Sequence, residues 1–230
     1  RVGRRLVLND AGSVALEHAG QILRAERAMR DALADVARRT RALRVGTVAP
    51  APLWRLTALM TERFPGMVLT SQMLAQAEVE AGVVDGDFDL GIGLRPVALP
   101  MVCSTRLMVE NLAVVLPSEH ALAARSSVSM AELDGETFLL LKDIGFWRKV
   151  CDQNLPHSEF IVQEDPGVFE GLIGSSPLPH FITDAPSFAA SVPDRVIVPI
   201  RDAAAHTTFY LLARTDCRQE AENLFDWVSR

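Results

Sequence analysis

Short apolar runs alternate with segments of helical periodicity from about residue 43 to the end of the chain. Runs rich in Val, Ile, Leu and Phe predict strands, and apolar positions that recur every three or four residues predict helices. The expected strands are 43–48, 67–73, 88–93, 101–109, 111–116, 137–141, 159–163, 180–183, 195–200 and 206–213. The expected helices are 53–64, 76–84, a short one capped by Ser129, 145–154, 166–173 and 216–228. This alternation indicates parallel βαβ units.

One polar stretch, 117–120, interrupts the series and is expected to mark the crossing between two substructures. The pattern therefore predicts two α/β lobes separated by a cleft. The first lobe is expected to comprise residues 43–117 and 200–230, and the second residues 118–199.

The first 41 residues have a different pattern. Residues 1–9 alternate bulky and charged side chains, which favours an exposed hairpin arm, and Asn9 is placed to cap a helix over 10–41. Apolar and small residues in this helix recur at spacings of four and three, which is typical of a coiled-coil seam. The seam consists of Ala15, Ala19, Ile22, Glu26, Met29, Leu33 and Val36. We expect dimerisation through its apolar and small members; the alternative is a long surface helix that lies on its own domain.

Composition narrows the class of protein. A chain of 230 residues with 49% hydrophobic residues can bury a sizeable core, which excludes a disordered chain, a collagen-like repeat and a disulfide-stapled miniprotein. The formal net charge of −6 conceals an asymmetry, because residues 1–44 hold ten arginines and five acids and the remaining residues are strongly acidic. Such a division suggests a basic segment attached to an acidic, soluble body.

Cysteine usage and hydropathy favour a cytoplasmic protein. Cys103, Cys151 and Cys217 are an odd, widely spaced set that gives neither a disulfide framework nor metal-ligand pairs. No uncharged apolar run has the length of a membrane span, and no basic start followed by an apolar stretch resembles a secretion signal.

Several motifs, taken in order, resemble the LysR-type transcriptional regulators over essentially the whole chain. They are Arg1-x-x-Arg4-x-Leu6-x-Leu8-Asn9-x-Ala11-Gly12, then Leu43-Arg44-Val45-Gly46, Phe64-Pro65 and Gly86-Asp87-Phe88-Asp89-Leu90-Gly91-Ile92. The resemblance implies an α/β, two-lobed type 2 periplasmic-binding-protein-like effector domain preceded by a long linker helix. Residues 1–9 would be the end of the wing of a winged helix-turn-helix whose recognition helix lies before Arg1.

The resemblance also implies partners. The full-length protein would bind double-stranded DNA, sense a small-molecule effector and form a homodimer or homotetramer. Arg4 and Arg5 on the wing would contact phosphate or a narrow minor groove, and the alternative is that they only solvate the arm. Without its recognition helix, the chain itself is expected to bind DNA weakly and without sequence preference.

Effector-binding residues are expected at the carboxyl ends of parallel strands, where ligands usually bind in open α/β sheets. Carried over by position, they are Val48, Ala49, Pro50, Leu74, Ala75, Gln76, Asp143, Ile144, Gly145, Phe146, Glu164, Asp165, Thr183 and Asp184. The chain departs from the family where Pro50 and Pro52 stand in place of a common Ser or Thr, and where Gln76 replaces a short hydroxyl residue.

Two features of the second lobe have competing interpretations. The four acids (Asp143, Glu164, Asp165 and Asp184) would suit a cationic or amine-bearing effector, or would serve only as helix caps. Phe146 and Trp147 would stack on a flat ligand, or would belong to the core.

An enzyme is not expected. His157, His180 and His206 lie far apart in the sequence, and no nucleophile elbow, metalloprotease pair or glycine-rich nucleotide loop occurs. No cofactor or metal is implied. Redox sensing would need a thiol with a depressed pKa, for which only Arg148 and Lys149 beside Cys151 are candidates. We therefore expect a regulator; the alternatives are a solute-binding protein or a small enzyme on the same two-lobed fold.

Overall fold

The computed structural model describes residues 9–12, 15–16, 18–23, 25–26, 29, 42–185 and 194–230. The chain divides into two compact units, Arg1–Ala42 and Leu43–Arg230.

In the first unit, the described residues from Asp10 to Met29 are helical. Asn9 caps this helix as predicted, because its Oδ1 accepts a hydrogen bond of 2.8 Å from the Gly12 N–H. Seam residues Ala15, Ala19, Ile22 and Met29 are exposed in the single chain. Leu33, Val36 and the predicted arm with Arg4 and Arg5 lie outside the described residues.

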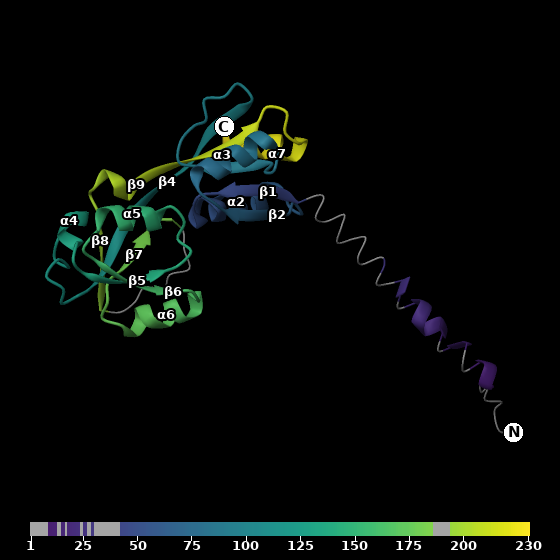
Figure 1. Cartoon of the computed structure of the whole chain (residues 1–230), viewed down its shortest axis with the longest axis horizontal. Coiled ribbons are helices and arrows are strands. Elements are labelled where there is room, and N and C mark those ends of the chain that lie inside the picture. The colour runs from purple at the N-terminus through teal and green to yellow at the C-terminus, as the bar shows by residue number, and fades with distance from the viewer. Residues whose placement is uncertain are drawn as a thin grey trace. The chain divides into compact units, whose positions relative to one another are not determined.

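The second unit is built on a nine-stranded mixed sheet with strand order β2-β1-β3-β9-β4-β7-β5-β6, in which β8 also pairs with β4 (Figure 1). The first lobe contains β1 (Leu43–Thr47), β2 (Leu69–Met73), β3 (Leu90–Gly93), α2 (Pro50–Arg63), α3 (Gln76–Asp85) and α7 (Gln219–Val228). The second lobe contains β5 (Thr137–Leu141), β6 (Glu159–Gln163), β7 (His180–Thr183), β8 (Arg195–Pro199), α4 (Met130–Leu133), α5 (Trp147–Asn154) and α6 (Pro166–Ser175). A short 3-10 helix, η1 (Ala203–Ala205), precedes β9 (His206–Arg214).

One long strand, β4 (Val102–Pro117), runs through both lobes. Val102–Asn111 pair with β9 in the sheet of the first lobe, whereas Leu112–Pro117 pair with β7 and β8 in the second. The predictions of two strands here and of a crossing at 117–120 are therefore wrong: the crossing lies at Asn111–Leu112. The prediction left the acid Glu110 between two strands, but the antiparallel ladder with β9 continues through it to Asn111.

From residue 43 onward, the other predicted elements are confirmed to within a few residues. Helix α2 begins at Pro50, three residues before its predicted start, because proline needs no hydrogen-bond partner at the first helical position. Ser129 caps α4, where its hydroxyl accepts from the Glu132 N–H and the Glu132 side chain accepts from the Ser129 N–H.

Each lobe has its own hydrophobic core. The core of the first lobe includes Leu43, Ile92 and Phe209, and that of the second includes Phe138 and Leu116. Phe146 packs against both cores, so one side chain from the start of α5 links the two lobes.

Candidate functional site

The loops that follow β1 and β5 touch each other, one from each lobe. The Phe146 N–H donates a hydrogen bond of 2.9 Å to the Val48 carbonyl oxygen. Gly145 has φ of +63°, and a Cβ there would lie 2.9 Å from the Ala49 Cα and against the Val48 carbonyl. We call this meeting of Val48 and Ala49 with Gly145 and Phe146 the interlobe contact. It brings together four of the predicted effector-binding residues.

Backbone bonding shapes the first-lobe side of this contact. Val48 N–H donates to the Ile92 carbonyl at 3.2 Å, and the Thr47 hydroxyl donates to the Ala49 carbonyl at 2.7 Å. Pro50 and Pro52 then occupy the first and third positions of α2 and supply no N–H. This helix start consequently offers fewer donors to a ligand than most helix N-termini do.

The aromatic pair on the second-lobe side lies in the core. The rings of Phe146 and Trp147 are 4.4 Å apart, and Phe146 meets Phe209 edge-on at 5.6 Å. Trp147 is only 4% exposed. These contacts favour the core interpretation of the pair over a free stacking platform.

A buried carboxylate lies beside the same pair. Glu110 of β4 is 1% exposed, and its Oε2 accepts a hydrogen bond of 3.1 Å from the Trp147 indole N–H. Burial raises the pKa of Glu110, while hydrogen bonds from Thr183 and Trp147 act in the opposite direction. Sequence reasoning missed Glu110, although a lone acid within the apolar run 107–116 was a signal for it.

The neighbouring residue, Asn111, ties three strands together at the crossing. Its N–H donates to Asp184 Oδ1 at 2.8 Å, and its Oδ1 lies 2.8 Å from His206 Nδ1. Asp184 and Thr183, two predicted site residues at the end of β7, thus belong to the polar cluster where β4 changes sheets.

Of the three remaining predicted acids, Asp165 and Glu164 bond to nearby residues in the second lobe. Asp165 caps α6 by accepting from the Val168 N–H at 3.0 Å, as the capping alternative predicted. Glu164 pairs with Lys142 at 2.7 Å, and this hydrogen bond holds the pKa of Glu164 below its ordinary value. Asp143 is exposed, and Ile144 packs against the core of the second lobe.

Gln76 is engaged inside the first lobe. Its Oε1 accepts from the Leu94 N–H at 2.7 Å, and its Nε2 donates to Glu80 Oε1 at 2.6 Å. The Ala75 N–H donates to Glu78, and the Leu74 N–H donates to the Thr47 carbonyl at 2.9 Å. Leu74 therefore adjoins the end of β1, whereas the Gln76 amide already has both a donor and an acceptor partner.

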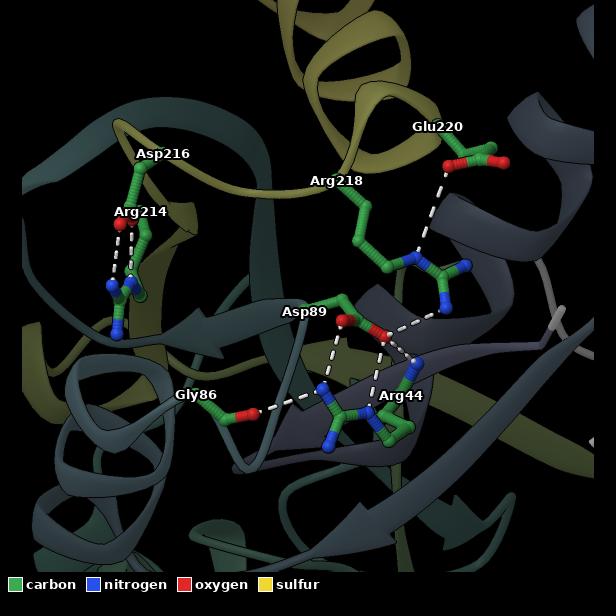
Figure 2. Close-up of polar contacts among 7 residues, drawn as sticks. All are labelled: Arg44, Gly86, Asp89, Arg214, Asp216, Arg218 and Glu220. Atoms are coloured by element: carbon green, nitrogen blue, oxygen red, sulfur yellow. Dashed lines mark hydrogen bonds and ion pairs between the residues drawn. The ribbon is translucent and has the colours of Figure 1, made fainter. Parts of the chain in front are cut away.

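A separate polar cluster lies where the chain enters β1 (Figure 2). Asp89 is 7% exposed and accepts from the Arg44 N–H at 2.8 Å and from the Arg44 guanidinium at 2.9 and 3.2 Å. Arg218, the residue before α7, approaches Asp89 at 3.8 Å. Although burial raises the pKa of Asp89, the Arg44 hydrogen bonds and the Arg218 charge hold it below its ordinary value. A cavity of about 170 Å³ adjoins the cluster, lined by Gly86, Phe88, Asp89, Arg214, Asp216, Cys217 and Arg218.

Burial acts against a reactive thiol at Cys151 and Cys217. Burial raises the pKa of Cys151 to about 12, and Arg148 is paired with Asp152 at 2.9 Å. The charge of Arg148 lowers the pKa of Cys151, but burial outweighs it, so the hypothesis of a thiol with a depressed pKa at Cys151 is wrong. Burial also raises the pKa of Cys217. Within the described ranges, no group of three or more His, Cys, Asp or Glu side chains is arranged to hold a metal ion.

None of the helices in the described part of the chain combines the length and apolarity needed to cross a lipid bilayer.

Comparison with known proteins agrees with this architecture. The family described as the LysR substrate binding domain matches residues 37–230. The HTH-type transcriptional regulator CbbR of Rhodospirillum rubrum is 26% identical over 227 residues, which cover 93% of this chain and 74% of that protein. Several other curated relatives are matched over about half of their length.

Two solved structures show the same fold. The reduced OxyR regulatory domain of Pseudomonas aeruginosa aligns with a TM-score of 0.61 and 17% identity, over 82% of this chain and 97% of that one. The BenM effector binding domain with its effector benzoate aligns with a TM-score of 0.57 and 18% identity, over 81% and 90% of the two chains. The two-lobed, periplasmic-binding-protein-like architecture of residues 43–230 is thereby confirmed.

Proposed function

Because this chain belongs to the LysR family of transcriptional regulators, we propose that its Leu43–Arg230 unit senses a small-molecule effector between the two lobes. The interlobe contact is the observation that carries this proposal. It joins the carboxyl ends of a parallel strand from each lobe, and ligands bind at such ends in open α/β sheets.

The strands β4 and β9 connect the two lobes, so a change at the interlobe contact can alter how the lobes are arranged. They run side by side from Val102↔Arg214 to Asn111↔His206, and β4 then continues into the second lobe (Figure 1). A ligand that binds one arrangement of the lobes better than another shifts the population toward that arrangement. At saturation, the free-energy difference between the two arrangements changes by the difference between the ligand's binding free energies for them.

The output of this change is regulation of transcription. The helix predicted over 10–41 dimerises through its seam and passes the movement of the lobes to a DNA-binding segment, in a cytoplasmic homodimer or homotetramer. CbbR, a relative, is named an HTH-type transcriptional regulator, which supports double-stranded DNA as the partner of the full-length protein. Arg4 and Arg5 contact that DNA. The proposed role requires no catalysis, and the relatives' names as regulators support this.

Trp147 offers a direct test of ligand binding between the lobes. The chain has three tryptophans. Trp54 is 51% exposed on α2, and Trp227 packs edge-on against Phe64 in the first lobe. Replacing both with Phe leaves Trp147, hydrogen-bonded to Glu110, as the single reporter.

A broad metabolite library is screened with this W54F/W227F chain by thermal shift, because a ligand that binds only the folded state raises Tm. Each stabilising compound is then titrated while Trp147 emission is recorded. The proposal predicts a saturable change in emission at the concentrations that raise Tm. Stabilising compounds that all leave the Trp147 spectrum unchanged would place binding elsewhere and contradict the proposal.

A further inference from the structure

The interlobe contact leaves one hydrogen-bond donor and one acceptor for a ligand that separates the loops. Val48 O and Phe146 N–H are bonded to each other at 2.9 Å, and Val48 N–H is already bonded to Ile92. Separation of the loops therefore exposes one carbonyl on the first lobe and one N–H on the second. Both groups must find new partners, because an unpaired polar group in a closed site is destabilising.

The helix starts beside the contact add few donors. Pro50 and Pro52 contribute none, as tertiary amides. In α5, the N–H groups of Arg148 and Lys149 already donate to the carbonyls of Gly145 and Phe146 at 3.1 and 3.0 Å. An anion that needs several N–H donors at once is poorly served by this arrangement.

Charge near the contact also disfavours an anion. Asp143 lies two residues before Gly145 and is exposed, and Glu110 is buried beside Trp147. Two of the basic side chains nearest in the sequence are paired, Lys142 with Glu164 at 2.7 Å and Arg148 with Asp152 at 2.9 Å, and Lys149 is exposed on α5.

Resting on the function proposed above, we propose that the effector is a neutral amide-like molecule that breaks the interlobe contact and replaces both of its hydrogen-bond partners. The carbonyl oxygen of a primary amide or lactam accepts from the Phe146 N–H, and its N–H donates to the Val48 carbonyl. A carboxylate or an ester carries acceptors only and leaves the Val48 oxygen without a donor. Leaving one such group unpaired weakens binding by about tenfold.

Gly145 makes the contact possible. Its positive φ disfavours any other residue, and a methyl group would press on the Val48 carbonyl and the Ala49 Cα. Gly145→Ala should therefore separate the two loops and expose the Phe146 N–H. Gly171→Ala is the matched control, because a Cβ at Gly171 in α6 meets no atom within 4 Å.

Hydrogen exchange of the Phe146 amide in the whole chain tests the contact itself. We expect protection in the parent chain and in Gly171→Ala, and exchange at least about tenfold faster in Gly145→Ala, since this amide loses its partner. Fast exchange in the parent chain, or equal protection in all three chains, would contradict the hydrogen bond between the Phe146 N–H and the Val48 carbonyl in the chain without ligand.

Matched ligands test the chemical class. The W54F/W227F chain is titrated with triplets that share one ring, such as benzamide, methyl benzoate and benzoate, or nicotinamide, methyl nicotinate and nicotinate. The proposal predicts that the amide binds at least about tenfold more tightly than the ester and the carboxylate and changes Trp147 emission. The ester separates the effect of the missing donor from that of the negative charge.

Two results overturn the proposal in different ways. If the carboxylate binds as tightly as the amide, the amide class is wrong and the sensing function stands. The same holds if no triplet binds while the library yields a ligand without an amide group that changes Trp147 emission. If no compound of either set changes Trp147 emission, both fail.

Discussion

Removing the carboxylate of Asp89 should destabilise the first lobe more than removing any nearby exposed acid. Asp89 is 7% exposed, and its two oxygens accept three hydrogen bonds from Arg44 within 3.2 Å (Figure 2). Asp89→Ala leaves the Arg44 N–H without its side-chain partner. It also removes the carboxylate that the guanidinium groups of Arg44 and Arg218 share.

The magnitude follows from the kind of bond that is lost. A hydrogen bond to a charged group contributes about 1.5–3 kcal/mol, and the exposed guanidinium of Arg44 reduces the share of the ion pair through solvent screening. We therefore expect the free energy of unfolding to fall by about 2–4 kcal/mol. The effect should diminish in acid: Asp89 has a depressed pKa, so its contribution is present above the unfolded-state pKa and is lost as the pH falls through the folded-state pKa.

Urea unfolding of the whole chain at pH 7, followed by tryptophan fluorescence, measures this change. Asp87→Ala is the control, because Asp87 is an exposed acid two residues away and should cost less than about 0.5 kcal/mol. Equal unfolding free energies for the two variants would refute the view that the Arg44–Asp89 cluster holds the start of β1.

Three further predictions rest on other parts of the structure. His180 is 5% exposed, its Nδ1 has no hydrogen-bond partner among the described residues, and burial lowers its pKa to about 4 from 6.5. Its contribution to the free energy of unfolding should be complete above pH 6.5 and fall by about 3 kcal/mol towards pH 4. Urea midpoints measured against pH should show this decrease, and His180→Phe should reduce it. Ile22→Asp combined with Met29→Asp should reduce the molar mass measured by light scattering to that of one chain, because charges would enter the seam; an unchanged mass counts against the seam. Iodoacetamide at pH 8 should modify exposed Cys103 before buried Cys151, whose pKa is about 12, and peptide mapping that finds Cys151 modified first would contradict the burial of its thiol.

Local patterns were sufficient to predict most of the elements. Strand 137–141 is a short apolar run, and helix 166–173 begins with a proline at its first position, so their placement needed no tertiary information. The length of β4 could not be predicted in this way. Only Glu110 was left between the two predicted strands. The partners supplied by Trp147, Asp184 and His206, from other parts of the chain, make Glu110 and Asn111 compatible with one continuous strand.

The candidate effector-binding residues were placed by the family resemblance together with the position of ligands in open α/β sheets. Because ligands bind at the carboxyl ends of parallel strands, Val48, Gly145 and Phe146 were expected near one another, and the structure brings them together. Their direct hydrogen bond depends on how the two lobes meet, which no local pattern encodes. For the same reason, the side-chain partners that occupy Gln76 and Glu164 became evident only in three dimensions.

Hydrogen exchange of the whole chain, with and without a stabilising ligand, tests effector binding between the lobes most directly. Sensing at the interlobe contact predicts that the ligand changes exchange in two peptides together, one spanning residues 46–50 and the other residues 143–147. Changes confined to one lobe, or to the cavity beside Arg218, would contradict it.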